Sequence, residues 1–205
     1  MSDLTILIPA AGASSRMRGA DKLLTEIDGI PFLRRTAQIA LAASPLVVIT
    51  LRPQDQARAQ VLHGLALTTL VIPDAASGLS ASLRGAAAAI NRGRLLILPA
   101  DMPDITAEDL RLMVAASDLA PDAILRATAA DHTGGDTEGH PVIFPSALLP
   151  AFGDLTGDEG ARSILQAHRS RIQRFALPDR HALTDLDTPE AWAAWAQSAS
   201  RTRTS

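Results

Sequence analysis

Short apolar runs alternate with amphipathic segments along the chain, and the runs are bounded by turn residues. Runs of this length predict buried strands, and apolar residues at helical spacing predict the helices between them. The expected strands are 4–9, 46–50, 68–72 and 95–99, and the expected helices are 32–43, 54–62 and 79–91. This alternation is typical of an α/β fold, and the uninterrupted run at 95–99 indicates a parallel strand covered on both faces.

The second half of the chain gives weaker signals. Thr106 and Asp109 form a capping-box pattern that predicts a helix through 116. Thr188 followed by Pro189 predicts the start of a last helix, which carries the two tryptophans. Further strands are expected at 123–127, 142–144 and 172–176, a helix at 159–168, and a mobile loop at 131–139. With no repeat or linker, we expect one domain over 1–198 and a frayed tail over 199–205.

Composition narrows the functional classes. The chain has 205 residues, a net charge of -3 and 3% aromatic residues, so it lacks the basic surface and stacking platform of a nucleic-acid binder. It contains no cysteine, which excludes disulfides and thiolate chemistry. We expect no signal peptide, and the sequence has no apolar stretch of the roughly 20 residues that span a membrane. We therefore expect a cytoplasmic protein with neither nucleic-acid nor membrane partners.

Lys22 is the only lysine among 19 basic residues. Lysine and arginine serve equally well on most solvated surfaces, so a lysine kept in such a chain can mark a place that needs a compact point charge. Chance survival of one surface lysine explains the same observation equally well.

The segment 10–22 directly follows the first expected strand and reads Ala-Ala-Gly-Ala-Ser-Ser-Arg-Met-Arg-Gly-Ala-Asp-Lys. Small residues let the backbone approach a ligand, and successive N–H groups with hydroxyls can hold phosphate oxygens. Arg16 and Lys22 add positive charge to the same loop. The segment matches neither the P-loop nor the G-x-G-x-x-G fingerprint. The candidate nucleotide-binding residues in it are Ala10, Ala11, Gly12, Ala13, Ser14 and Ser15. An ordinary flexible loop is the alternative, although its length is unusual.

Asp101 stands just past the expected strand 95–99, at the same sheet edge as this loop. A carboxylate there suits a hard cation, and the alternative role of helix cap is better filled by Thr106. Asp187 precedes the last helix, where negative charge stabilises by about 0.3–1 kcal/mol, but Thr188 already serves as the cap. Arg162 lies near another expected helix start and could contribute to an anion site.

The pattern Ala-Ala-Gly-x-Ser-x-Arg-Met followed by Gly-x-x-Lys resembles the opening of the MobA-like NTP transferases, and among them most resembles the molybdenum cofactor cytidylyltransferases. Further segments follow in the family's order at 78–83, 100–103, 139–142, 156–162 and 185–190. The resemblance implies a single-domain Rossmann-like nucleotidyltransferase of the nucleotide-diphospho-sugar transferase type. Such a fold has a mostly parallel central sheet with helices on both faces.

The resemblance also implies roles for residues. Asp101 would be the first ligand of Mg²⁺, or of Mn²⁺ as an alternative, with Asp187 as the second and Asp185 as support or substitute. Arg16, Lys22 and Asp101 would be catalytic, and His140 and Arg162 would contact the acceptor. The residues expected near the nucleotide base and ribose are Gly78, Leu79, Ser80 and Ser82.

The implied reaction transfers a nucleoside monophosphate to a phosphorylated acceptor and releases pyrophosphate. The acceptor would be a phosphorylated pterin, the molybdenum cofactor, and a molybdoenzyme or its maturation factor would be the protein partner. Relatives that use GTP tend to carry Gly-Gly where this chain has Ala11-Gly12. The extra methyl group of Ala11 would crowd a purine, which favours CTP over GTP by at most about 1–3 kcal/mol.

Other functions remain open from the sequence. A guanylyltransferase, a sugar- or alditol-phosphate nucleotidyltransferase and a non-catalytic nucleotide-binding module fit the same motifs. Gly78 to Ser82 also falls one residue short of the G-x-S-x-G elbow of serine hydrolases, with His168 and His181 as available bases. Two departures from the family pattern are Arg18, which lengthens the loop, and Ala100, which replaces a frequent glycine.

Overall fold

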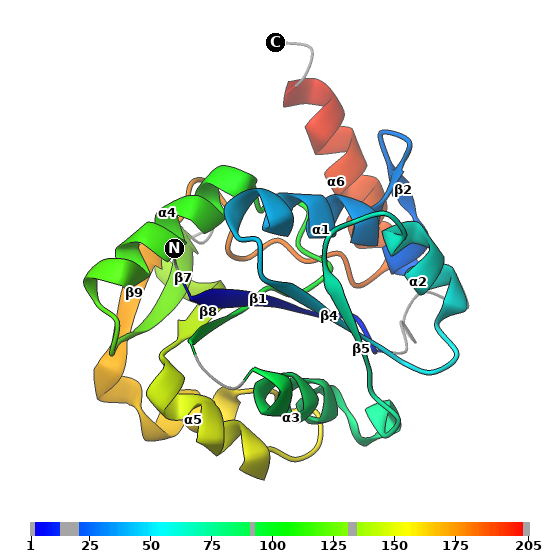
Figure 1. Cartoon of the computed structure of the whole chain (residues 1–205). Coiled ribbons are helices and arrows are strands. Elements are labelled where there is room, and N and C mark those ends of the chain that lie inside the picture. The colour runs from blue at the N-terminus through cyan, green and yellow to red at the C-terminus, as the bar shows by residue number, and fades with distance from the viewer. Residues whose placement is uncertain (1–2, 13–20, 91–92, 131–134, 203–205) are drawn as a thin grey trace.

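The computed structural model describes residues 3–12, 21–90, 93–130 and 135–202. They form three layers, a central sheet with helices against both faces (Figure 1). The predicted α/β class, with a mostly parallel sheet covered on both sides, is confirmed. None of the described helices is long and apolar enough to cross a membrane.

The central sheet has seven strands in the order β5-β4-β1-β6-β8-β7-β9. Among the described strands of this sheet, only β8 runs antiparallel to its neighbours, β6 and β7. β1 is central, with Ile6 opposite Val47 of β4 and Leu96 of β6. The bounds are β1 Leu4–Pro9, β4 Val47–Leu51, β5 Thr68–Val71, β6 Arg94–Ile97, β7 Ile124–Ala130, β8 Asp136–Phe144 and β9 Ile172–Ala176.

One face of the sheet is covered by α1 (Phe32–Ala43), α2 (Gln56–Leu62) and α4 (Ala107–Leu119), which share one hydrophobic core with it. A second core joins the other face to α3 (Leu79–Ala89), the 3₁₀ helix η4 (Ser146–Asp154) and α5 (Arg162–Ala167). The predicted capping box of α4 is confirmed, because Thr106 Oγ1 accepts the Asp109 N–H at 3.1 Å and Asp109 Oδ2 accepts the Thr106 N–H at 2.8 Å. Short 3₁₀ turns also occur at η3 (Ala75–Ser77) and η5 (Arg169–Arg171).

A small hairpin and the last helix form a third, smaller apolar cluster. The 3₁₀ helix η2 (Lys22–Leu24) leads into the hairpin of β2 (Glu26–Ile27) and β3 (Ile30–Pro31). The last helix, α6 (Pro189–Thr202), packs Trp192 edge-on against Phe32 with ring centroids 5.3 Å apart. Its C-terminal part projects away from the body of the molecule (Figure 1).

Two sequence expectations need correction. The loop expected at 131–139 is a strand from Asp136 onward, because β8 hydrogen-bonds to β7 along this stretch despite its turn-forming composition. The helix expected at 159–168 begins only at Arg162, because Gly160 has a positive φ of 58°.

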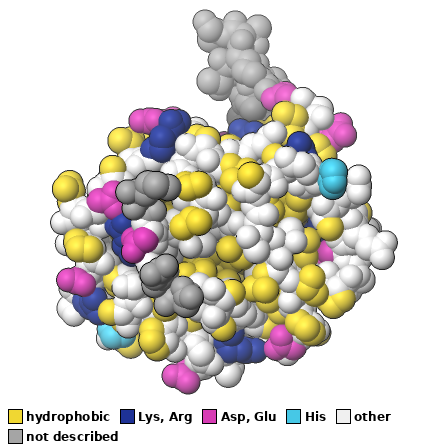
Figure 2. Space-filling view, viewed as in Figure 1, with side chains coloured by type: hydrophobic (Ala, Val, Ile, Leu, Met, Phe, Trp, Pro, Cys, Tyr) yellow, Lys and Arg dark blue, Asp and Glu magenta, His cyan; other side chains and the backbone are white. Residues whose placement is uncertain are grey.

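On the face seen in Figure 2, acidic and basic side chains are scattered among apolar and uncharged ones.

Candidate active site

The candidate site lies at the carboxyl edge of the sheet, where the strand order reverses. The chain builds β1, β4 and β5 outward in one direction, and β6 then pairs with the opposite side of β1. The segments that follow β1 and β6 diverge at this point, and such switch points are where open α/β sheets bind ligands. The residues after β1 and after β6 line one cavity of about 460 Å³.

At one side of this cavity Lys22 bridges two carboxylates. Its Nζ lies 2.6 Å from Asp101 Oδ2 and 2.5 Å from Asp187 Oδ1. Burial alone would lower the pKa of Lys22. The charge and hydrogen bond of Asp101, and then the hydrogen bond and charge of Asp187, together outweigh burial and raise the pKa. The lysine is therefore an ammonium ion at neutral pH. Three segments from different parts of the chain meet here through Lys22. Two of them are also joined by their backbones, because the Leu186 N–H donates to the Asp101 carbonyl at 3.0 Å.

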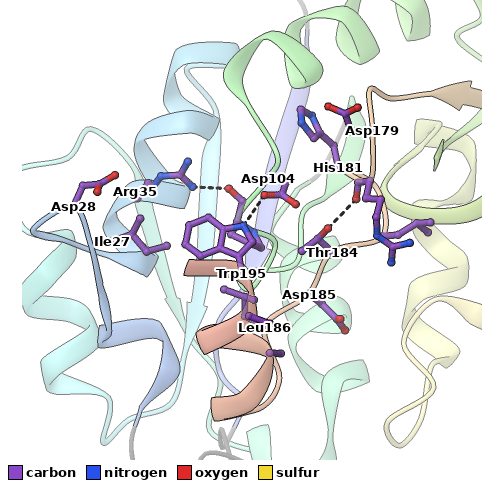
Figure 3. A pocket seen from close by; sticks show the side chains of 15 residues that line it. Ile27, Asp28, Arg35, Asp104, Asp179, His181, Thr184, Asp185, Leu186 and Trp195 are labelled. Carbon is purple, nitrogen blue, oxygen red and sulfur yellow. Dashed lines mark hydrogen bonds between the residues drawn. The ribbon is translucent and has the colours of Figure 1, made fainter. Parts of the chain in front are cut away.

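Asp185 is among the residues that line a different cavity, of about 730 Å³, on the α1 and α6 side (Figure 3). Trp195 Nε1 donates to Asp104 Oδ1 at 2.7 Å in that cavity, and Arg35 donates to the Pro103 carbonyl at 2.8 Å. Partial burial, and then the charges of Asp187 and Asp101, raise the pKa of the Asp185 carboxyl. The charges of Asp101 and Asp187 thus act on Asp185, although Asp185 lines the neighbouring cavity.

A further cavity, of about 510 Å³, adjoins the first and shares Pro9, Gly12, Leu79 and Asp158 with it. Several residues expected to bind a nucleotide line one or both cavities: Ala10, Ala11, Gly12, Gly78, Leu79 and Ser82. An added Cβ at Gly12 would meet no described atom within 4 Å, so no described side chain blocks a ligand there. Ala13, Ser14, Ser15 and Arg16 lie outside the described residues.

The start of α3 is fixed by a neighbouring segment. Gly78 has a φ of 97°, and a Cβ there would lie 2.3 Å from Asp158 Oδ1. That carboxylate accepts the Leu79 N–H at 3.1 Å, so Asp158 caps α3 from a distant part of the chain. Ser80 is fully buried, and its hydroxyl donates to the Thr156 carbonyl at 3.0 Å. Ser80 therefore holds α3 to this segment, and it is not among the described residues that line either cavity.

His140 joins the first cavity to a fourth, of about 350 Å³, between β8, α3 and α5. Arg162 lines the fourth cavity, so the structure brings both expected acceptor residues to it. His140 Nδ1 is buried and has no hydrogen-bond partner among the described residues. Burial first, and then the positive charge of Arg126, lower the pKa of His140 to about 4. The imidazole is therefore neutral at pH 7 and can act as a hydrogen-bonding group but not as a cation.

Sequence reasoning missed two residues of this region. Asp158 entered only as part of the family segment 156–162, yet it lines two cavities and caps α3. Arg58 was not singled out, although it is 1% exposed in α2 and contacts both ends of the segment 10–22. A sequence signal existed, because Arg58 and the buried Leu62 are four residues apart and so share the apolar face of α2.

Comparison with known proteins gives the family and its relatives. The model of the family described as MobA-like NTP transferase domain matches residues 6–172. A protein of Natronomonas pharaonis named probable molybdenum cofactor guanylyltransferase is 31% identical over 129 residues, which are 62% of this chain and 63% of that relative. A protein of the same name from Trichormus variabilis is 30% identical over 196 residues, which are 93% of this chain and 89% of that relative.

Solved structures share the fold. The crystal structure of Rv0371c from Mycobacterium tuberculosis H37Rv has a TM-score of 0.79 and 22% identity, with 95% of this chain and 97% of that chain covered. A structure of Rv0371c in complex with manganese has a TM-score of 0.75 and 22% identity, with 93% and 96% covered. At this identity the likeness carries the architecture and nothing finer.

Proposed function

This chain belongs to the family of MobA-like NTP transferase domains, and from this premise we propose that it transfers CMP from CTP to a phosphorylated acceptor of the molybdenum cofactor type. One observation carries the proposal. Lys22, Asp101 and Asp187 form a charged cluster in a cavity that adjoins two others. One neighbouring cavity holds residues expected to bind the nucleotide, and the other holds Arg162 and shares His140.

The carboxylates of the cluster fit a divalent cation. Asp101 and Asp187 both turn toward one positive charge, and their oxygens lie within hydrogen-bond distance of it. No group of three or more acidic or histidine side chains able to hold a metal occurs among the described residues. Two carboxylates completed by substrate phosphates are the usual arrangement for Mg²⁺, and Mn²⁺ prefers similar oxygen ligands. When bound there, the cation would supply neutralisation of phosphate charge.

The proposed reaction is an attack by an acceptor phosphate oxygen on the α-phosphorus of the NTP. A new P–O bond forms, and the bond from the α-phosphorus to the α,β-bridging oxygen breaks. Pyrophosphate leaves with that electron pair. The attacking phosphate is already an anion at pH 7, so no general base is required. Lys22 would stabilise negative charge as the pyrophosphate departs, and neutral His140 would orient the acceptor through a hydrogen bond.

CTP is proposed as donor because Ala11 lines the cavity expected to hold the base and is 4% exposed. Its methyl group takes space that a purine would need and a pyrimidine would not. GTP is the second candidate, because the relatives from Natronomonas pharaonis and Trichormus variabilis are named guanylyltransferases. The two donors lead to the same chemistry at the α-phosphorus and differ only in the fit of the base.

The deciding experiment measures thermal stabilisation by CTP, GTP, UTP and ATP, each with and without Mg²⁺, followed by pyrophosphate release with molybdopterin as acceptor. A ligand at about 100 times its dissociation constant adds about 2.7 kcal/mol of stability. Mg²⁺-dependent stabilisation and turnover with CTP alone support the proposal. Selective response to GTP would establish the second candidate. The absence of any response from folded protein would reject nucleotidyl transfer.

Comparison of Ala11→Gly with the wild-type protein tests whether the Ala11 methyl group selects the base of the donor nucleotide. If the Ala11 methyl group excludes a purine, this variant gains affinity for GTP while its affinity for CTP stays unchanged. An equal gain for both nucleotides would mean that the methyl group obstructs the cavity without selecting the base.

A further inference from the structure

Arg58 is the largest fully buried side chain of the described protein, with 1% of its surface exposed. It lies in α2, outside the four cavities described above, and the apolar face of that helix would ordinarily carry an aliphatic residue. A buried guanidinium needs hydrogen-bond partners, and even a well-paired one rarely improves on a hydrophobic residue of similar volume. Its contacts should therefore indicate a purpose other than bulk stability.

The contacts of Arg58 divide between two segments. Nη1 donates to the Ala10 carbonyl at 2.5 Å and to the Gly12 carbonyl at 2.9 Å. Nε and Nη2 donate to the two oxygens of Asp21, at 2.7 Å and 2.9 Å. The Asp55 carboxylate lies 3.7 Å from Nη1 and adds to the charge balance. One planar group thus holds both ends of the segment 10–22 at once, as the fork geometry of arginine allows.

Each end that Arg58 holds is adjacent to the candidate site. Gly12 lines both the cavity with the carboxylate pair and the cavity with Ala11. Asp21 accepts the Leu23 N–H at 3.1 Å and so caps η2, whose first residue is Lys22. Displacement of Asp21 would therefore move Lys22 relative to Asp101 and Asp187.

We propose that Arg58 is a positioning residue that clasps the two ends of the nucleotide-binding loop and fixes Gly12 and Lys22 relative to each other for NTP binding. The inference rests on the proposed function for the identity of the ligand. Without the clasp, the loop ends would have to be ordered when the nucleotide binds, and this cost weakens binding. Acceptor binding, on the β8 and α5 side, should be unaffected.

Arg94 provides a matched control. It is likewise a buried arginine, at 8% exposure, and it donates to Ser117 Oγ at 2.7 Å and pairs with Asp118. It begins β6 and so lies at the opposite edge of the sheet from Asp101. Arg58→Gln and Arg94→Gln therefore each remove a buried arginine that pairs with an aspartate, one beside the candidate site and one far from it.

The test compares these two variants and Asp21→Asn with the wild type, in protein shown by circular dichroism to be folded at the assay temperature. We expect Arg58→Gln and Asp21→Asn to raise the dissociation constant for Mg²⁺·CTP about tenfold, as for a loss of ordering before binding. Arg94→Gln should change it less than twofold, and the KM for the acceptor should stay constant in all variants. If Arg58→Gln does not fold, Asp21→Asn alone decides. The inference would be overturned if the deciding variant, Arg58→Gln or otherwise Asp21→Asn, bound Mg²⁺·CTP with a dissociation constant within twofold of wild type.

A second readout needs no nucleotide. Lys22 remains the only lysine in all of these variants, so the rate of its acylation by an amine reagent, followed by peptide mass spectrometry, reports its placement. We expect faster acylation in Arg58→Gln than in the wild type and no change in Arg94→Gln. If wild-type protein binds none of the nucleotides, the proposed function fails, and the acylation rates alone decide whether the clasp exists. Equal rates in the wild type and Arg58→Gln would then refute it.

Discussion

Lys22 occupies a position that an arginine would fill poorly. Its compact ammonium lies within 2.6 Å of two carboxylates from different segments, whereas a guanidinium is wider and spreads its charge over a plane. We predict that Lys22→Arg lowers turnover at least about 100-fold, because displacements near 1 Å cost this much. The melting temperature should remain near that of the wild type.

Steady-state kinetics and a thermal melt check this prediction. Arg111→Lys is the control, because that residue lies exposed on α4 and pairs only loosely with Glu108, at 3.5 Å. Retention of wild-type turnover by Lys22→Arg would mean that the single lysine has no special role.

Substitution of the three aspartates of the region should lower turnover to different extents. Asp101 and Asp187 both contact Lys22, whereas Asp185 lines the neighbouring cavity. We predict that Asp101→Asn and Asp187→Asn each lower turnover by about 10²-fold or more, as expected when a charge that stabilises the transition state is lost. Asp185→Asn should lower it by less than about tenfold. Titration of Mg²⁺ against activity in the three variants measures the difference, and a larger loss in Asp185→Asn than in Asp187→Asn would reverse the assignment.

His140 should make folding stability depend on pH. Its pKa is about 4 in the folded protein and near its ordinary 6.5 in the unfolded chain, so only the unfolded chain binds the proton between these values. The stability linked to the neutral imidazole is therefore complete above pH 6.5 and is lost as the pH falls toward 4. Between pH 7.5 and pH 5 this loss amounts to about 2 kcal/mol.

Urea denaturation at the two pH values tests the prediction. His140→Gln should lose less stability than the wild type across this interval, by about the same 2 kcal/mol. His63→Gln, at the exposed C-terminal cap of α2, should behave as the wild type. Equal losses in the wild type and His140→Gln would contradict the lowered pKa.

At the scale of elements, the start of α3 depends on one glycine. Gly78 adopts a φ of 97°, and a Cβ there would clash with Asp158 Oδ1 and with the Gly157 carbonyl at 2.6 Å. We predict that Gly78→Ala destabilises the fold by about 1–3 kcal/mol through backbone strain and displaces Asp158 from the Leu79 N–H. Gly153→Ala, where a Cβ meets no described atom within 4 Å, should have little effect. Thermal unfolding of both variants measures the difference, and equal melting temperatures would contradict it.

Strands with strong apolar patterns were predictable from the sequence, and β8 was only partly so. The run at 4–9 is apolar because β1 is covered on both faces, and the strand forms with the predicted bounds. The stretch 136–139 forms a strand because β7 supplies its hydrogen bonds, and such tertiary pairing leaves no trace in local composition. Short elements such as the β2 and β3 hairpin are likewise fixed by packing rather than by propensity.

The candidate site was predictable where chemistry coincides with a strand end. The segment 10–12 directly follows β1, and Asp101 comes shortly after the end of β6, so their placement at one edge follows from a parallel sheet. The roles of Ser80, Asp158 and Arg58 did not follow, because each depends on contacts between residues far apart in sequence. The family resemblance gave residue types and order, and it could not separate a buried structural hydroxyl from one that lines a cavity.

At the scale of the whole molecule, the candidate site combines Lys22, near the beginning of the chain, with Asp187, near its end. Asp187 reaches Lys22 because α6 docks on the first helix, where Trp192 packs with Ile27, Phe32 and Leu186. The backbone of Leu186 in turn holds the Asp101 carbonyl. The C-terminal helix thus sets the position of the second carboxylate, and a change in the packing of this helix should alter the site.

We therefore predict that Trp192→Ala destabilises the protein by about 3–5 kcal/mol and raises the Mg²⁺ concentration needed for half-maximal activity severalfold. Trp192→Phe should change the free energy of unfolding by less than about 1 kcal/mol, because Nε1 of Trp192 is buried with no hydrogen-bond partner among the described residues. Denaturant unfolding and metal titration of both variants provide the measurement. If Trp192→Ala lost stability but kept its response to Mg²⁺, the second carboxylate would be held by its own segment, independently of α6.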